Sequence, residues 1–245
     1  MKKLVVLILL LASISANAQV SFIQHANQAG TATSRTVAEP TGTAEDDIVF
    51  LFCDIDAQDG DWTDPTDFTE IDQQPSAGAH DVYLGYKIRG STAGEALTCT
   101  YSGTSANIRV ISATFRGVDT TTPLDVTYST GSHHNTTAND DCLTAAQPVT
   151  TVTDDSWVLL FQSCEDDADI TEGMPSGFTE RFSFDALDRI ETMASMVDTT
   201  AGLVTPGVWT HTDTASTDDS SNFTVVLRES GASPPSSNDF LLVTD

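Results

Sequence analysis

Six aspartates lie close together in DIDAQDGDWTDPTDFTE, residues 54–70. Clustered carboxylates can bind calcium, act as acid and base in catalysis, or keep a loop solvated. An EF-hand loop needs Gly at position 6 and Glu at position 12, where this stretch has Asp59 and Pro65, so it is not one. Calcium also accepts irregular sets of oxygen ligands, and the stretch is compatible with such a site or with a solvated acidic loop. The candidate calcium ligands are Asp54, Asp56, Asp59 and Asp61, together with Asp166, Asp167 and Asp169 in a later acidic stretch.

The sequence offers no motif for catalysis. It contains no HExxH, no GxSxG and no glycine-rich phosphate loop. With 36 Asp and Glu residues, a pair of neighbouring carboxylates carries almost no information about a glycosidase site. His133 and His134 are adjacent, and adjacent side chains of an extended segment point in opposite directions, so one metal ion rarely binds both. We therefore expect no enzymatic activity, and no cofactor other than calcium.

Trp62 is the candidate ligand-binding residue. It lies within the acidic stretch, where we expect its ring to be partly exposed. Exposed aromatic rings beside carboxylates bind sugars, because sugar C–H faces stack on the ring and sugar hydroxyls bond to the acids. The residue types around Trp62 therefore make a glycan the favoured ligand.

The first residues have the pattern of a secretory signal peptide. Lys2 and Lys3 precede an apolar run, residues 4–11, and Ala16-Asn17-Ala18 fits a cleavage site. The run is far shorter than the roughly 20 residues that span a bilayer. We expect cleavage after Ala18, a secreted, extracellular or periplasmic protein, and no membrane insertion.

The chain is strongly acidic, with a formal net charge of −26. Removal of Lys2 and Lys3 with the leader would bring it to −28. Such a surface repels phosphate backbones and anionic lipids, which excludes nucleic acid as a partner.

The four cysteines are Cys53, Cys99, Cys142 and Cys164. An even number of cysteines behind a signal peptide predicts two disulfides, for which three connectivities are open. The simplest hypothesis keeps each bond within one half of the chain, as Cys53–Cys99 and Cys142–Cys164.

The elements that position these residues occur twice. PTDFTE at 65–70 returns as PSGFTE at 175–180, and an Asp pair precedes an apolar run both at 48–53 and at 157–164. We expect a signal peptide (1–18), a first β-sandwich copy (19–127), a second copy (128–230), and a linker with a C-terminal tail (231–245). The tail carries DFLLV, which could add as a strand to another surface.

Each copy has strand periodicity. Ile111, Ala113 and Phe115 alternate with polar residues, whereas the run 48–53 is apolar throughout, as a central strand covered on both faces would be. Turn residues separate the segments at short spacing, and no helical period follows residue 20. The sequence predicts an all-β, tandem-duplicated antiparallel β-sandwich of jelly-roll type. Whether the copies form separate sandwiches or one fused sandwich is left open.

With this pattern in view, the chain resembles the β-sandwich domains of bacterial secreted proteins and of phage virion and tail proteins, which carry a Pro-x-Gly-Trp-Thr-like turn. The resemblance covers about residues 30–229, and Phe replaces Trp in both turns. It rests on DDIVFLF, DPTDFTE, YLGYKIRG and ISATFRGVD in the first copy and on DDSWVLLF, MPSGFTE and FTVVLRES in the second.

The resemblance implies a structural, adhesive or receptor-binding role and supplies no catalytic residues. We expect a non-enzymatic extracellular protein for adhesion or glycan recognition, ordered by calcium in its acidic loop. One alternative is a virion or surface-assembly protein that binds other surface proteins or copies of itself through its tail. A secreted polysaccharide hydrolase is the other.

Overall fold

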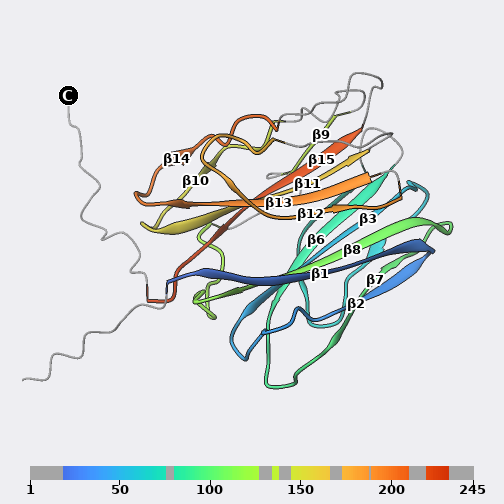
Figure 1. Cartoon of the computed structure of the whole chain (residues 1–245), viewed down its shortest axis with the longest axis horizontal. Helices are drawn as coiled ribbons and strands as arrows, with labels where there is room; N and C mark the ends of the chain where they lie inside the picture. Colours follow the sequence, from blue (N-terminus) through green and yellow to red (C-terminus); the bar gives the residue numbers. More distant parts are fainter. Residues whose placement is uncertain are drawn as a thin grey trace, which may run out of the picture.

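The protein is described by a computed structural model over residues 19–75, 80–126, 134–137, 145–165, 173–187, 189–209 and 219–231. In this part of the chain every regular element is a β-strand, and the strands pair antiparallel (Figure 1). None of it forms a helix that could cross a membrane. The prediction of an all-β chain is confirmed.

Two five-stranded sheets dominate the fold (Figure 1). In spatial order, the first large sheet is β1 (Ser21–Ala32), β8 (Ala106–Arg116), β3 (Ile48–Ile55), β6 (Asp81–Ile88) and β5 (Thr69–Pro75). The second large sheet is β12 (Thr179–Asp185), β13 (Arg189–Asp198), β11 (Ser156–Glu165), β15 (Ser220–Leu227) and β9 (His134–Thr137).

Two smaller sheets lie outside the large ones. The first outer sheet is β2 (Ser34–Ala38), β7 (Ala96–Tyr101) and β4 (Trp62–Thr63). The second pairs β10 (Val149–Thr150) with β14 (Leu203–Val204). The described strands therefore make four layers, with the large sheets in the middle.

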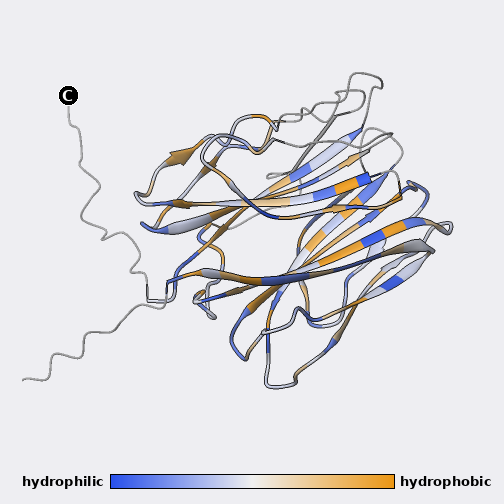
Figure 2. Cartoon of the chain, in the orientation of Figure 1, coloured by the Kyte–Doolittle hydropathy of each residue, from blue (hydrophilic) through white to orange (hydrophobic). Residues whose placement is uncertain are grey.

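One hydrophobic core joins the two large sheets. Phe161 of β11 lies 5.5 Å from Phe50 and 5.8 Å from Phe52 of β3, measured between ring centroids. Phe223 of β15 also contacts Phe52. Figure 2 shows hydrophobic positions along the strands of both large sheets. The halves therefore bury apolar side chains against each other, which is the largest stabilising term available to them.

β3 explains why this core can sit inside a stack of four layers. Every one of its residues is buried. Phe50 and Phe52 face the second large sheet, while Leu51, Cys53 and Ile55 face the first outer sheet. The unbroken apolar run at 48–53 thus predicted the environment of the strand correctly.

The strand orders of the two large sheets correspond. β3 and β11 are central, each with the closing strand of its half on one side (β8, β15) and β6 or β13 on the other. The edge strands β5 and β12 pair with β6 and β13, and each follows a β-turn that recurs, because Phe68 N donates to Pro65 O and Phe178 N to Pro175 O, both at 3.1 Å. The third residue of each turn has positive φ, 65° at Asp67 and 90° at Gly177.

The disulfide Cys53–Cys99 is present, as predicted, and ties β3 to β7. It therefore links the first large sheet to its outer sheet. Cys164 is fully buried and disulfide-bonded. Its predicted partner Cys142 lies outside the described residues.

Candidate functional site

The acidic stretch is divided between two places in the fold. Asp54 and Asp56, at and just after the end of β3, contact arginines of both large sheets, whereas Asp59 and Asp61 border the β7–β8 turn. The candidate ligands therefore do not converge on one point. Among the described residues no three His, Cys, Asp or Glu side chains are grouped as a metal site.

Asp54 and Asp56 belong to a charge cluster between the large sheets, which we call the interface cluster. Arg109 Nη1 of β8 donates to Asp54 at 3.0 Å and to Asp56 at 2.9 Å. Arg189 Nε of β13 donates to Asp56 at 2.7 Å. Glu191, also on β13, has a carboxyl oxygen 3.6 Å from Arg109 Nε. All but Asp56 are at most 2% exposed.

The interface cluster balances its charges through Glu191. Burial, followed by the charge of Asp54, raises the pKa of Glu191 well above its usual value, although Arg109 and Arg189 oppose the rise. The two arginines therefore face two aspartates and a third carboxyl whose charged form is disfavoured. Because buried charges are costly unless paired, this matching lets the cluster sit inside the protein.

The interface cluster also fixes how the two sheets meet. Ser163 of β11 donates to Asp54 at 2.6 Å, and Arg109 donates to the backbone carbonyls of Ala186 and Leu187 in the β12–β13 turn. Each of these bonds joins the first half to the second. The cluster thus adds directional polar contacts between the halves to the apolar packing.

A serine, a histidine and an aspartate meet beside the interface cluster without forming a catalytic triad. His80 Nε2 lies 3.0 Å from Ser221 Oγ and 3.9 Å from Asp54 Oδ2. A triad needs the acid on the other ring nitrogen and a nucleophile that a substrate can reach. Here one nitrogen faces both groups, and all three residues are fully buried.

Of the remaining candidate calcium ligands, two contact the β7–β8 turn and three lie outside the described residues. Asp59 accepts hydrogen bonds from the backbone N–H of Thr104, which lowers its pKa. Ser102 Oγ lies 2.8 Å from the backbone nitrogen of Asp61. Asp166, Asp167 and Asp169 lie outside the described residues. Calcium coordination by the acidic stretches stays a prediction.

The expectation that Trp62 is partly exposed is wrong. Its side chain is 5% exposed and packs edge-on against Tyr101, with ring centroids 5.3 Å apart. β4 pairs with β7 and thereby turns the ring inward. A buried ring offers no face to a sugar, so Trp62 carries no binding argument.

The acidic stretch instead borders a polar groove, which we call the hydroxyl groove. It has a volume of about 490 Å³. Its walls are the turn at 63–68 on one side and β7 on the other, and Lys87 and Glu95 also line it. Thr63, Thr66, Thr98 and Thr100 place hydroxyl groups along it.

The hydroxyl groove continues a ladder of side-chain hydroxyls on the first outer sheet. Thr36 and Thr98 pair across the strands at 2.7 Å, and Ser34 and Thr100 pair at 3.1 Å. Each hydroxyl can donate and accept, so the ladder can rearrange to suit a polar ligand. The Thr98-x-Thr100 alternation was the sequence signal for this face, and our sequence analysis missed it.

One charged and one aromatic group complete the hydroxyl groove. Lys87 pairs with Glu95, and its ammonium lies 5.2 Å from the centroid of the Phe68 ring. Phe68 is itself half-buried against the core. The lysine is thus already paired within the protein, which suits a ligand bound by hydrogen bonds rather than a strong anion.

A carboxyl pair lies next to the hydroxyl groove. Burial, and then a hydrogen bond with Asp64, raises the pKa of Glu70 to about 7. The two carboxyls of a glycosidase instead face each other across a cleft at a separation of about 5–9 Å. Glu70 and Asp64 are held together by a hydrogen bond between their carboxyls.

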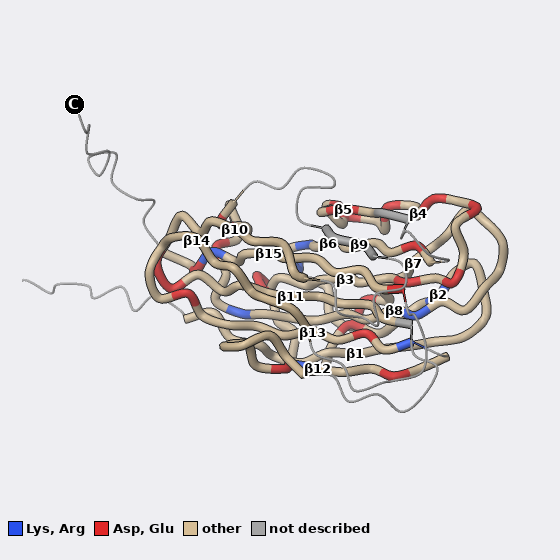
Figure 3. Tube along the Cα trace, turned by 90° about the horizontal axis from the view of Figure 1, so that it is seen from above, with Lys and Arg blue, Asp and Glu red and all other residues tan. Residues whose placement is uncertain are grey.

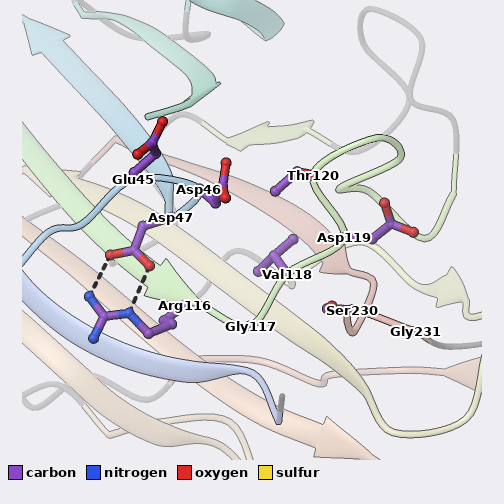
Figure 4. Close-up of a pocket in the computed structure, with 10 residues that line it drawn as sticks. All are labelled: Glu45, Asp46, Asp47, Arg116, Gly117, Val118, Asp119, Thr120, Ser230 and Gly231. Atoms are coloured by element: carbon purple, nitrogen blue, oxygen red, sulfur yellow. Dashed lines mark hydrogen bonds and ion pairs between the residues drawn. The ribbon is translucent and has the colours of Figure 1, made fainter. Parts of the chain in front are cut away.

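An acidic recess lies where the two halves join (Figure 4). Asp47 accepts two hydrogen bonds from Arg116, at 2.9 and 2.8 Å. Figure 4 shows Glu45 and Asp46 on one side of the recess and Asp119 on the other, separated by Thr120. Asp119 already accepts hydrogen bonds from the backbone N–H groups of Thr121 and Thr122, so its carboxylate is partnered within the protein.

Comparison with protein-family models, curated proteins and solved structures finds no match to this chain.

Proposed function

We propose that the chain is a non-catalytic extracellular recognition protein that binds a hydroxyl-rich ligand, a glycan, in the hydroxyl groove. The observation that carries the proposal is the set of threonine hydroxyls and carboxylates around Phe68. Sugars present alternating hydroxyl and C–H surfaces, which match such a lining. The volume of about 490 Å³ lies in the range of small-ligand sites.

The proposal includes a duplicated β-sandwich as the scaffold. The two large sheets share a strand order, and their turns share a hydrogen bond and a positive φ. Among the described residues, the turn at 63–68 lies next to the threonine-bearing β7 of the first copy, so we place recognition on that copy. Export fits the Cys53–Cys99 disulfide, since such bonds persist in oxidising compartments.

The acidic surface fits this setting. Figure 3 shows acidic positions outnumbering basic ones along the trace. A surface of this kind stays soluble and does not bind polyanions, which leaves neutral glycans and surface proteins as partners. Calcium ordering of the acidic loops belongs to the same proposal.

The test is binding of a panel of neutral oligosaccharides, measured by calorimetry. Thr98→Val should weaken binding by at least tenfold, because an apolar methyl replaces a hydroxyl in the groove. Thr36→Val is the matched control. It breaks the same hydroxyl pair, but Thr36 does not line the groove, so affinity should stay within about twofold.

Other outcomes would contradict the proposal in distinct ways. No binding at millimolar ligand would remove glycan recognition. Turnover of a bound polysaccharide would favour a hydrolase instead. A shift of the unfolding midpoint with millimolar calcium supports the metal, and no shift removes it.

A further inference from the structure

A second hollow lies beside the hydroxyl groove, between the edge strand β5 and the connection that follows β8. We call it the tyrosine pocket, because β6 contributes Tyr86 to its lining. Its volume is about 320 Å³, near the lower end of the range of small-ligand sites. The connection contributes residues of the segment 121–126, in which Leu124 pairs with Leu227 of β15. The tyrosine pocket therefore lies where the two halves meet.

The tyrosine pocket and the hydroxyl groove meet at one carboxyl pair. Asp64 lines the groove, Glu70 lines the pocket, and a hydrogen bond joins their carboxyls. The consecutive residues Phe68 and Thr69 are divided between the two hollows in the same way. Phe68 packs on the side of the first outer sheet, whereas Ile71 of the pocket belongs to the shared core. The two hollows are thus neighbours on either side of β5, with the carboxyl pair at their boundary.

Tyr86 gives the tyrosine pocket an aromatic wall. The side chain is half-buried, and its ring centroid lies 6.2 Å from that of Phe50 in the core. A hydrogen bond links its hydroxyl to Thr69. The ring is therefore held in place before a ligand binds, which lowers the entropic cost of binding. Half-buried Leu124 and Val126 also line the pocket.

Polar groups complete the lining of the tyrosine pocket. Thr69, Thr121 and Thr122 are exposed and bring hydroxyls to it. Each carboxyl of the pair has two oxygens, so oxygens outside their mutual bond can accept from ligand hydroxyls. None of the described residues that line the pocket is basic. Arg228 donates to Thr122 from outside and lies 3.5 Å from its own partner, Asp125. The lining therefore suits a neutral ligand rich in hydroxyls, with a C–H face for the ring.

We propose that the ligand is an extended glycan chain, which lies across β5 with one sugar in the hydroxyl groove and another in the tyrosine pocket, stacked on Tyr86. The proposal rests on glycan binding in the hydroxyl groove and adds a second subsite to it. A chain held in both hollows gains contacts from each, while it loses its translational freedom only once. A single sugar fills one hollow and binds more weakly.

Calorimetry with cello-, manno- and xylo-oligosaccharides of one to six units tests the second subsite. Affinity should rise at least about tenfold from the shortest member that binds to the hexasaccharide of the same series, because only the longer chain reaches both hollows. Tyr86→Leu removes the ring and should weaken binding of the hexasaccharide about fivefold or more, while the shortest member stays within about twofold. Tyr86→Phe keeps the ring and is the matched control, so it should bind both ligands like the parent.

Hydrogen exchange of the unaltered protein provides a test that needs no variant. The hexasaccharide should slow exchange of the amides in 121–126, which line the tyrosine pocket and not the groove. The shortest member should protect the turn at 63–68 and leave 121–126 unchanged. This measurement decides the matter even if Tyr86→Leu does not fold.

Three results would overturn the second subsite and leave glycan recognition by the hydroxyl groove standing. They are an affinity that does not depend on chain length, a Tyr86→Leu variant that affects short and long chains equally, and no protection of 121–126 by the hexasaccharide. Absence of binding in all three series at millimolar ligand would remove the groove and the second subsite together.

Discussion

Asp81 is the residue whose protonation should most visibly affect stability. It is 4% exposed, and burial raises its pKa to about 7 from 3.8. The folded protein therefore takes up a proton that the unfolded chain lacks between about pH 4 and 7. Stability must fall as pH rises through that window and level off above it. Glu70 and Glu191, whose pKa values are also raised, act in the same direction.

Asp81→Asn should flatten part of this dependence. The amide imitates the protonated acid, so the variant should be more stable than the parent at pH 8, by about 1–3 kcal/mol, and similar to it near pH 4. Urea unfolding at the two pH values measures this. Asp67→Asn, at an exposed site, is the control for loss of a charge. Equal slopes for parent and Asp81→Asn would contradict the assignment.

Arg109 and Arg116 lie on the same strand and provide a matched pair. Arg109 is fully buried against Asp54, whereas the Arg116 side chain is 46% exposed beside Asp47. Arg109→Met should cost about 3–5 kcal/mol, because it leaves a buried carboxylate without its partner. Arg116→Met should cost less, about 1–2 kcal/mol, because its guanidinium is half-exposed and the buried Asp47 still accepts a hydrogen bond from Ala44 N. Chemical denaturation of both variants distinguishes them, and similar costs would show that the interface cluster contributes little.

At the scale of elements, the disulfide should hold two layers together. Cys53–Cys99 closes a loop with a sequence separation of 46 residues. Loss of the bond in Cys53→Ala/Cys99→Ala should lower the free energy of unfolding by about 3–4 kcal/mol, mainly by freeing the unfolded chain. Thermal unfolding of the variant, compared with that of the parent, measures the cost. A loss of less than about 1 kcal/mol in the free energy of unfolding would mean that the packing of β3 on β7 holds the two layers together without the disulfide.

The strands themselves were easier to predict from the sequence than the contacts between strands that are distant in the sequence. The apolar run at 48–53 predicts a strand buried on both faces, and the alternation at 111–115 predicts a strand buried on one face. In both cases the pattern of apolar residues along the sequence follows the burial of the strand. The Cys53–Cys99 bond was among the connectivities that the repeat favoured. In contrast, Trp62 is buried because Tyr101 of β7 covers it, a contact between distant elements that no local pattern encodes.

The candidate site was predicted least well, for a related reason. Asp54 and Asp56 were predicted to be calcium ligands because the sequence shows only the residues next to them along the chain, which are also acidic. Their partner Arg189 is 133 residues away from Asp56 and reaches it across the interface between the sheets. The hydroxyl groove likewise combines a turn, β6 and β7. Sequence shows which side chains exist, whereas the pairing of layers decides which of them meet.

At the scale of the whole molecule, the two halves share one core. The inner faces of both large sheets contribute to a single cluster of buried apolar residues. Neither half can cover its inner face without the other. We therefore expect one cooperative unfolding transition for the described part of the chain, not two.

Hydrogen exchange of the variant Phe161→Ala tests this most directly. Phe161 belongs to β11 but packs on Phe50 and Phe52 of β3. The cavity should cost about 3–5 kcal/mol. If the core is shared, the slowest amides of β3 and of β11 should accelerate by the same factor, on the order of a hundredfold or more. Acceleration confined to β11 and its neighbours, with β3 unchanged, would contradict the account.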